Sequence, residues 1–296
     1  MRVAVTGATG FIGRHVVAEL HRRGHETTAC VRNASRVPDQ FLRIGTEVRE
    51  IAIGAGAEPD WQDLGSPDVL IHLAWGGLPN YHSLHHFEKE LPEQYSFLAR
   101  LVKTGLPNLA VTGTCFEYGM QSGALGEDDV CFPNNCYGFA KNTLYKQLNF
   151  LSRRNDFNLV WARLFYLYGD GQSSSSLLSQ LRQAVMEGRE VFDMSGGEQL
   201  RDYLPVTSVA EFLTTLATLG QDIGAINICS GKPISVRRLV ETWIHENKWK
   251  IELNLGHYPY PDYEPLAFWG KIDKLSTIIP AAGAAQPGSI AVSKAP

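Results

Sequence analysis

The chain has few cysteines, and they do not form pairs. Its five cysteines are scattered and odd in number: Cys30, Cys115, Cys131, Cys136 and Cys229. This arrangement fits neither a disulfide framework nor paired zinc ligands. A reducing compartment suits it best, so we expect a cytoplasmic protein.

Long hydrophobic runs and an excess of positive charge are also missing. No apolar stretch is long enough for a signal peptide or a membrane span. The formal net charge of -4 gives no basic surface that would attract nucleic acid or an anionic membrane. We therefore expect neither of these partners. With 296 residues, of which 44% are hydrophobic, the chain is long enough for one full domain and a smaller one.

Histidines gather in one place, at His82, His85 and His86. Adjacent histidines point apart on a helix, and no neighbouring cysteine or carboxylate completes a set of metal ligands. We predict a solvated helix start there and no metal site.

A glycine-rich turn opens the chain. Residues 2–6 are a short apolar run, glycines follow, and apolar residues then recur at helical spacing over residues 11–20. This order predicts strand, turn and helix. Glycines in such a turn permit the tight bend, the approach of a pyrophosphate and the close packing of helix on sheet. We predict a dinucleotide site with these residues: Gly7, Thr9, Gly10, Phe11, Ile12 and Gly13.

The expected second strand, residues 26–31, ends without the acidic residue that would bind a free ribose 2′-hydroxyl. Arg32 follows it, with Arg36 nearby. Guanidinium groups form charge-assisted hydrogen bonds with phosphates. The pair therefore favours NADP(H), with NAD(H) as the alternative if both arginines are simply solvated.

Further apolar runs alternate with stretches of helical length. They predict strands at residues 48–53, 69–73 and 109–112, and this alternation indicates an α/β fold with a parallel, doubly wound sheet. Such sheets bind ligands at the carboxyl ends of their strands. We therefore assign the last residue of the fourth strand and the two that follow it to the cofactor site: Leu73, Ala74 and Trp75.

Tyr137 and Lys141 are one helical turn apart and share a face of their helix. An ordinary tyrosine has a pKa of about 10. A neighbouring ammonium favours the phenolate and would bring that pKa closer to neutrality. The alternative is a half-buried tyrosine beside a solvated lysine.

These patterns resemble the extended short-chain dehydrogenase/reductase family, in the branch that acts on nucleotide sugars. The matching motifs follow the family's order: residues 7–13, 71–74, 112–119, 137–141, 163–169 and 201–206. The resemblance implies a Rossmann NAD(P)-binding domain over residues 1–164 and 202–230. It implies a smaller C-terminal substrate-binding cap over residues 165–201 and 231–296.

The resemblance also implies a catalytic triad of Thr114, Tyr137 and Lys141. Tyr137 would transfer the proton, and the Thr114 hydroxyl would hydrogen-bond the reacting oxygen. Lys141 would also hydrogen-bond the nicotinamide ribose. Implied substrate contacts are Thr114, Cys115, Phe116, Tyr166 and Arg201.

Two of these substrate contacts carry their own alternatives. Many family members have asparagine where Tyr166 stands. Arg201 suits a diphosphate, although an interdomain ion pair is the alternative. A homodimer is compatible with the sequence.

Relatives that dehydrate the sugar follow the threonine with an Asp-Glu pair, but this chain has Cys115 and Phe116 there. Elimination of water then lacks its acid and base, and Glu117 should face differently from Phe116. The motif resembles most closely reductases of 4-keto-6-deoxyhexoses carried on a nucleoside diphosphate, with dTDP favoured. A 4-epimerase that holds NAD tightly is the alternative, and a non-catalytic dinucleotide sensor is a remote one.

Four elements are expected in the second half of the chain: a helix opened by residues 173–176, a strand at 191–194, a helix at 206–219 and a last sheet strand at 226–228. The alanine- and proline-rich stretch from residue 281 onward has little to pack against, so we expect it to fray.

Overall fold

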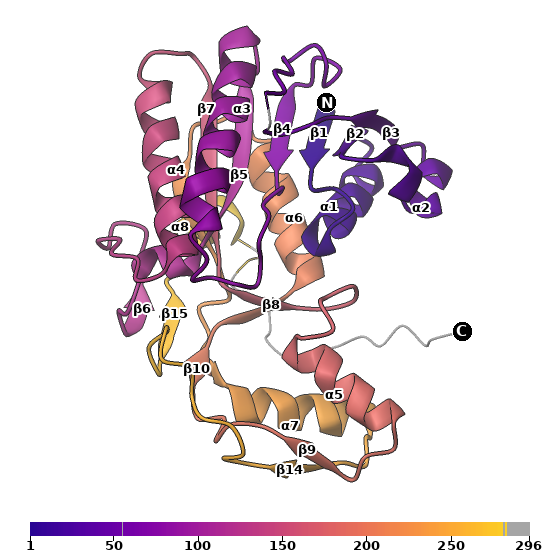
Figure 1. The fold of residues 1–296 in the computed structure, drawn as a ribbon, viewed down its shortest axis with the longest axis vertical. Helices are drawn as coiled ribbons and strands as arrows, with labels where there is room; N and C mark the ends of the chain where they lie inside the picture. The colour runs from indigo at the N-terminus through magenta and orange to yellow at the C-terminus, as the bar shows by residue number, and fades with distance from the viewer. Residues whose placement is uncertain (55, 281, 283–296) are drawn as a thin grey trace. The chain divides into compact units, whose positions relative to one another are not determined.

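The computed structural model describes residues 1–54, 56–280 and 282. They divide into two compact units, and Figure 1 labels most of the helices and strands. The first unit contains residues 1–119, 130–164 and 210–226, and the second contains residues 120–129, 165–209 and the described residues from 227 onward. Apart from Ala282, the stretch expected to fray lies outside the described residues.

A seven-stranded sheet forms the centre of the first unit, in the order β12-β7-β5-β4-β1-β2-β3. All strand pairs from β7 to β3 are parallel, which confirms the doubly wound fold. The chain order reverses between β1 and β4, and ligands bind at this position in such sheets. The strands are β1 Arg2–Thr6, β2 Glu26–Val31, β3 Glu47–Glu50, β4 Val69–His72, β5 Asn108–Thr114, β7 Asn158–Leu164 and β12 Gly224–Ile228.

The third strand is shorter than the expected residues 48–53. Its ladder continues for one hydrogen bond, from the Ile51 N–H to the Val31 carbonyl at 2.9 Å. Gly54 then adopts a φ of +90°. This left-handed conformation bends the chain directly after the expected end of the strand.

Helices of the first unit connect the strands. They are α1 Phe11–Arg22, η1 Ala34–Arg36, α2 Asp39–Arg43, the π-helix η2 His86–Glu90, α3 Leu91–Thr104, η3 Cys115–Tyr118, α4 Cys136–Ser152 and the greater part of α6 Val206–Ala217. None of the helices in the described residues is long and apolar enough to span a membrane.

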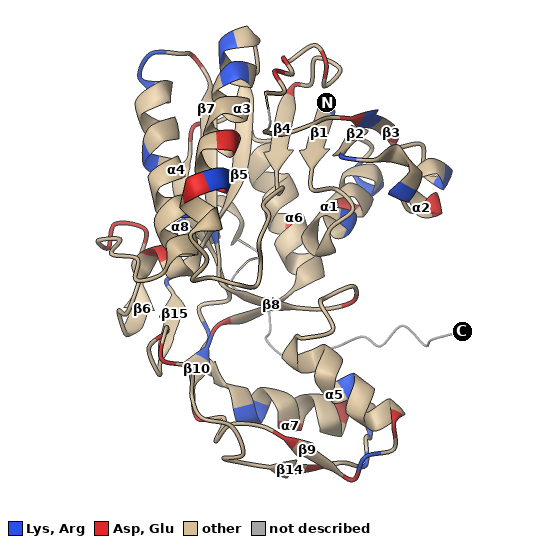
Figure 2. Cartoon of the chain, in the orientation of Figure 1, with Lys and Arg blue, Asp and Glu red and all other residues tan. Residues whose placement is uncertain are grey.

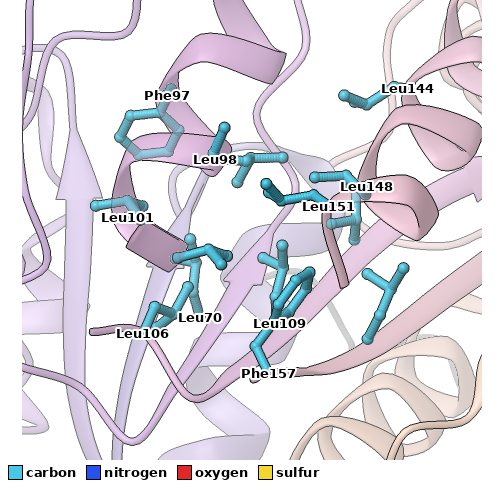
Figure 3. Packing of buried hydrophobic residues seen from close by; sticks show 14 of the residues in the cluster. Leu70, Phe97, Leu98, Leu101, Leu106, Leu109, Leu144, Leu148, Leu151 and Phe157 are labelled. Atoms are coloured by element: carbon cyan, nitrogen blue, oxygen red, sulfur yellow. The ribbon is translucent and has the colours of Figure 1, made fainter. Parts of the chain in front are cut away.

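Leucines of α3 and α4 pack onto the sheet. Leu98 and Leu101 of α3, Leu148 of α4 and Leu70 and Leu109 of the strands belong to one buried cluster (Figure 3). Each fully buried leucine contributes about 1.5 to 3 kcal/mol through the hydrophobic effect. Strands β4 and β5 carry no charged residue, whereas the edge strand β3 is charged (Figure 2). The apolar strands and the leucine stripes therefore hold α4 firmly against the sheet.

The second unit contains short strands and helices: β6 Gly123–Leu125, β8 Tyr166–Tyr168, α5 Leu177–Met186, β9 Val191–Asp193, β10 Leu200–Arg201, β11 Tyr203–Pro205, β13 Ile234–Ser235, α7 Val236–Asn247, β14 Glu252–Asn254, β15 Phe268–Gly270 and α8 Asp273–Ile278. Ser176 caps α5 through a hydrogen bond from the Ser179 N–H. Leu181 of α5 and Trp243 of α7 lie in its buried core. The expected strand near residue 191 and the helix after residue 176 are thus both present.

Candidate active site

Helix α4 carries Tyr137 and Lys141 on its first two turns. Asn135 caps the helix by accepting a hydrogen bond from the Gly138 N–H at 2.8 Å. Gly138 also lets the helix approach η3, because a Cβ there would lie 2.5 Å from the Phe116 carbonyl oxygen. The tyrosine is 9% exposed and the lysine 1% exposed. The alternative of a solvated lysine is therefore wrong.

Thr114 lies at the carboxyl end of β5, where it caps η3. Its hydroxyl accepts a hydrogen bond from the Phe116 N–H at 3.3 Å, and its own N–H donates to the Glu117 carboxylate at 2.9 Å. This reciprocal arrangement is a capping box. The Thr114 hydroxyl also hydrogen-bonds the Tyr137 phenol. The structure thus brings together the two hydroxyl groups that the sequence singled out.

Burial raises the pKa of Tyr137, and the acidic groups of Tyr81, Glu117 and Cys115 act in the same direction. We expected Lys141 to lower this pKa. Its ammonium lies 6.0 Å from the centre of the tyrosine ring and donates instead to the Thr112 carbonyl at 2.8 Å. The expected lowering is therefore wrong for this arrangement, and Tyr137 is a neutral phenol.

Lys141 is buried beside an aromatic ring. Its ammonium lies 4.1 Å from the centre of the Trp75 ring. Burial lowers the pKa of Lys141 to about 7, although the carboxylates of Glu117 and Glu90 raise it. A small change in its surroundings therefore decides whether this amine is charged at neutral pH.

Glu117 is fully buried beneath Thr114. Besides the Thr114 N–H, its carboxylate accepts hydrogen bonds from Trp161 Nε1 at 3.0 Å and from Arg163 Nε at 2.9 Å. Arg163 also donates to the Tyr118 hydroxyl at 3.1 Å. The sequence analysis predicted an orientation of Glu117 different from that of Phe116 but did not reveal this network. No local spacing reveals it, because its members come from η3 and β7.

Cys115 and Phe116 are buried on η3, at 5% and 9% exposure. The Phe116 ring lies 4.8 Å from the Tyr81 ring and 6.5 Å from the Tyr137 ring, measured between centroids. The backbone carbonyl of Tyr81 also accepts a hydrogen bond from the Tyr137 N–H at 3.0 Å. Phe116 is thus part of an aromatic wall beside Tyr137, and Tyr81 was not among the expected residues.

The histidine segment is not a solvated helix start. His86 is fully buried, whereas His85 is half-buried and pairs with Glu90 at 3.1 Å. The His86 ring lies 5.3 Å from the Tyr137 ring. The earlier expectation is wrong because it considered local spacing alone, whereas packing near α4 buries this ring. Within the described residues, no group of three or more histidine, cysteine or acidic side chains is arranged to hold a metal.

The glycine turn between β1 and α1 has the shape that a dinucleotide requires. Gly7 has a φ of +67°, and a Cβ there would lie 2.9 Å from the Ala74 nitrogen. A Cβ at Gly13 would collide with the Gly7 carbonyl oxygen. The first turn of α1 has no capping side chain and no acidic residue, so its N–H groups suit an anion. These features fit the pyrophosphate of NAD(P).

The other predicted cofactor residues lie around this edge of the sheet. Leu73, Ala74 and Trp75 follow β4 and are partly exposed. Arg32 and Arg36 are exposed around η1, and neither forms an ion pair or side-chain hydrogen bond within the part of the chain that the structure describes. Both guanidinium groups are therefore available to bind the 2′-phosphate of NADP(H).

Tyr166 and Arg201 belong to the second unit, where both contact Glu264. Arg201 is 2% exposed, and its Nη2 lies 2.9 Å from the Glu264 carboxylate. The Tyr166 hydroxyl donates to the same carboxylate. Arg201 also stacks over the Phe268 ring at 4.6 Å. The alternative for Arg201 was an interdomain ion pair, but its ion pair lies inside the second unit, and sequence spacing gave no indication of Glu264.

Comparison with known proteins gives a consistent result. Residues 3–229 match the model of the NAD dependent epimerase/dehydratase family. The chain is 33% identical over 272 residues to dTDP-6-deoxy-L-talose 4-dehydrogenase (NAD(+)) of Aggregatibacter actinomycetemcomitans, covering 91% of this chain and 99% of that protein. It is 25% identical over 284 residues to dTDP-6-deoxy-L-talose 4-dehydrogenase (NAD(P)(+)) of Kitasatospora kifunensis, covering 92% and 87%. A solved structure of MoeE5 in complex with UDP-glucuronic acid and NAD superimposes with a TM-score of 0.76 at 26% identity, covering 95% of this chain and 93% of that one.

Proposed function

Because the chain belongs to the NAD dependent epimerase/dehydratase family, we propose that it reduces the 4-keto group of a nucleoside-diphosphate 4-keto-6-deoxyhexose, with a dTDP-sugar and NADPH favoured. Two relatives are named as 4-dehydrogenases of dTDP-6-deoxy-L-talose. Oxidation of a 4-hydroxyl yields a 4-keto sugar, so the reverse of that reaction is the proposed one. The chain is thus proposed to be an oxidoreductase of deoxysugar biosynthesis.

The neutral Tyr137 phenol carries the proposal. Burial raises its pKa, and Thr114 holds its hydroxyl by a hydrogen bond. A ketone that accepts a hydride must also gain a proton, and a buried phenol at hydrogen-bond distance is a suitable donor. The reduced nicotinamide supplies the hydride when it is bound. Thr114 would hold the same oxygen and set its distance from the phenol.

Lys141 is proposed to supply a positive charge near Tyr137 after the phenol has given up its proton. Its pKa of about 7 allows it to be an ammonium or an amine near neutrality. An ammonium near the new phenolate lowers the free energy of that charge. Before that proton transfer, the hydrogen bond to the Thr112 carbonyl holds the Lys141 amine near the end of β5.

Dehydration is disfavoured by the residues that follow Thr114. Cys115 and Phe116 replace the acid and base that elimination needs. Glu117 is fully buried and holds Arg163 at 2.9 Å. Its carboxylate therefore has a structural partner and no free position for proton transfer.

A cofactor preference for NADPH is the second part of the proposal. Arg32 and Arg36 are exposed after β2 and have no partner within the described residues. A charge-assisted hydrogen bond to the 2′-phosphate contributes about 1.5 to 3 kcal/mol, which corresponds to a preference of about tenfold to a hundredfold. Arg32→Ala should remove most of it and leave NADH affinity intact, whereas Arg43→Ala on α2 should change neither. Equal NADPH and NADH affinities in the wild type would contradict this part.

The substrate contacts remain proposals as well. For Arg201 to bind a sugar diphosphate, the phosphates must displace the Glu264 carboxylate, which lies 2.9 Å from its guanidinium. Tyr166 would then be released from the same carboxylate. Glu264→Gln should therefore lower the KM for the sugar nucleotide if Arg201 binds it, and should leave cofactor affinity unchanged.

The test of function is a turnover screen. We expect dTDP-4-keto-6-deoxyhexoses to be reduced with one NADPH consumed per product, and Thr114→Val to slow the reaction without changing NADPH affinity. Conversion of a sugar nucleotide to its C4 epimer with no net loss of cofactor would instead identify the epimerase. Cofactor binding with no turnover of any sugar nucleotide would identify the protein as a non-catalytic dinucleotide sensor.

A further inference from the structure

We propose that Trp75 and His86 form a positioning pair for Lys141, in which the indole face supports the ammonium and His86 fixes the indole through its N–H. The proposal rests on the function proposed above, because it concerns the same site. It adds His86, for which the sequence suggested no role at this site, and it gives Trp75 a role in positioning Lys141. Neither residue is proposed to take part in proton transfer.

The first observation is the place of the ammonium. Lys141 Nζ lies 4.1 Å from the centre of the Trp75 ring and donates to the Thr112 carbonyl at 2.8 Å. The face of an indole attracts cations more strongly than any other side-chain ring. Two fixed contacts, one polar and one aromatic, thus define where the amine lies. A long lysine side chain otherwise has several rotamers available.

The second observation is the hydrogen-bond chain that holds the ring. Trp75 Nε1 lies 3.1 Å from His86 Nδ1, and His86 Nε2 lies 2.8 Å from the Asn80 carbonyl oxygen. An indole nitrogen can only donate. Nδ1 of His86 must therefore accept, and its proton must lie on Nε2, where it meets the carbonyl. One neutral tautomer satisfies both bonds, and burial lowers the pKa of His86, which keeps it neutral.

The third observation concerns the loop between the two residues. Glu90 is 7% exposed, pairs with His85 at 3.1 Å and accepts a hydrogen bond from Gln94 at 2.9 Å. It also accepts one from the Gly76 N–H. This anchoring fixes the backbone beside Trp75. The indole is therefore held at its backbone and at its N–H.

The titratable groups that face Lys141 set the expected response. Glu117 and Glu90 favour its charged form, and burial opposes it. His72 is close enough for Lys141 to lower the histidine pKa, and Tyr137 lies on the same helix face. Trp75 offers the nearer aromatic face, at 4.1 Å, whereas the Tyr137 ring lies at 6.0 Å. Removing that face should therefore make the amine harder to protonate.

The experiment follows the pH titration of Lys141 by NMR of ¹³C-labelled lysine in the full chain without cofactor, with Lys141→Met to assign its resonance. Trp75→Leu should shift the midpoint downward by about half to one pH unit, because an apolar side chain replaces the cation-binding face. Trp75→Phe keeps a face and should restore most of the wild-type value. Trp61→Leu removes an indole of the same unit that packs near Gly105 and should change nothing.

The role of His86 is read from the Trp75 indole N–H. In the wild type it should exchange slowly with solvent, and His86→Leu should speed that exchange at least about tenfold while moving the Lys141 midpoint in the same direction as Trp75→Leu. An unchanged or raised midpoint in Trp75→Leu would overturn the supporting face. Unchanged exchange in His86→Leu would overturn the anchor.

Activity is measured separately, so the two proposals can fail independently. If the wild type reduces 4-keto sugars, the pH at which kcat/KM changes should move with the Lys141 midpoint in Trp75→Leu and return in Trp75→Phe. Shifted titrations without any turnover would leave the positioning pair standing and refute the proposed function. Turnover with unshifted titrations would support the proposed function and refute the positioning pair.

Discussion

Replacing Glu117 by glutamine should strongly destabilise the first unit. The carboxylate is fully buried and accepts hydrogen bonds from the Thr114 N–H, from Trp161 Nε1 and from Arg163 Nε, at 2.9, 3.0 and 2.9 Å. A glutamine amide has one oxygen, so its NH₂ group must face a donor, and Arg163 loses the carboxylate that pairs with it at 2.9 Å. Breaking a buried pair by removing one partner costs about 3 to 5 kcal/mol. We expect the free energy of unfolding to fall by that amount.

Glu47→Gln is the matched control for this prediction. Glu47 pairs with Arg49 at 2.8 Å in the same unit, but their side chains are 54% and 35% exposed. Exposed pairs contribute at most about 1 kcal/mol. Urea unfolding of the full chain, followed by circular dichroism and tryptophan fluorescence, measures both variants. If the free energy of unfolding of Glu117→Gln lay within about 1 kcal/mol of the wild-type value, the buried network would not stabilise this unit. The claim that Glu117 holds Thr114 in place would then be contradicted.

Three further predictions concern the cofactor turn, the phenol and a buried histidine. Gly13→Ala should weaken NADPH binding at least about tenfold in a titration, because its Cβ would collide with the Gly7 carbonyl oxygen, whereas His21→Ala on the same helix should not. Tyr137→Phe should lower turnover at least about a hundredfold and leave NADPH affinity intact; turnover within a few-fold of wild type would exclude the phenol. Burial lowers the pKa of His72 to about 3, below its usual value of about 6.5. The folded state therefore binds fewer protons between these values, and stability present above pH 6.5 is lost as the pH falls. Between pH 7 and 5 the wild type should lose about 2 kcal/mol more than His72→Gln, and equal losses in urea unfolding would contradict this.

Much of the fold is local and was predictable for that reason. The strand, glycine turn and helix at residues 2–22 each follow from neighbouring residues, and β2 has the predicted bounds. The spacing of Tyr137 and Lys141 places both on one face of α4 because helical geometry requires it. The alternation of hydrophobic runs with stretches of helical length was sufficient to predict a parallel, doubly wound sheet.

The parts that the sequence analysis missed depend on contacts between distant segments. The burial of His86 comes from packing near α4, and the hydrogen bonds of Glu117 come from Trp161 and Arg163 on β7. The expected effect of Lys141 on Tyr137 also failed for this reason. Sharing a helix face did not determine where the long side chain would point, because Thr112 and Trp75 offered nearer partners.

The most direct test of the proposed function follows the hydride. NADPH that carries deuterium on the transferred position of its nicotinamide is incubated with the protein and a dTDP-4-keto-6-deoxyhexose, and the sugar is examined by NMR. We predict deuterium at C4 of the product and one NADPH consumed for each sugar reduced, with neither result in Tyr137→Phe. A C4 epimer that forms without net loss of NADPH, or a sugar that remains unlabelled, would contradict the proposal.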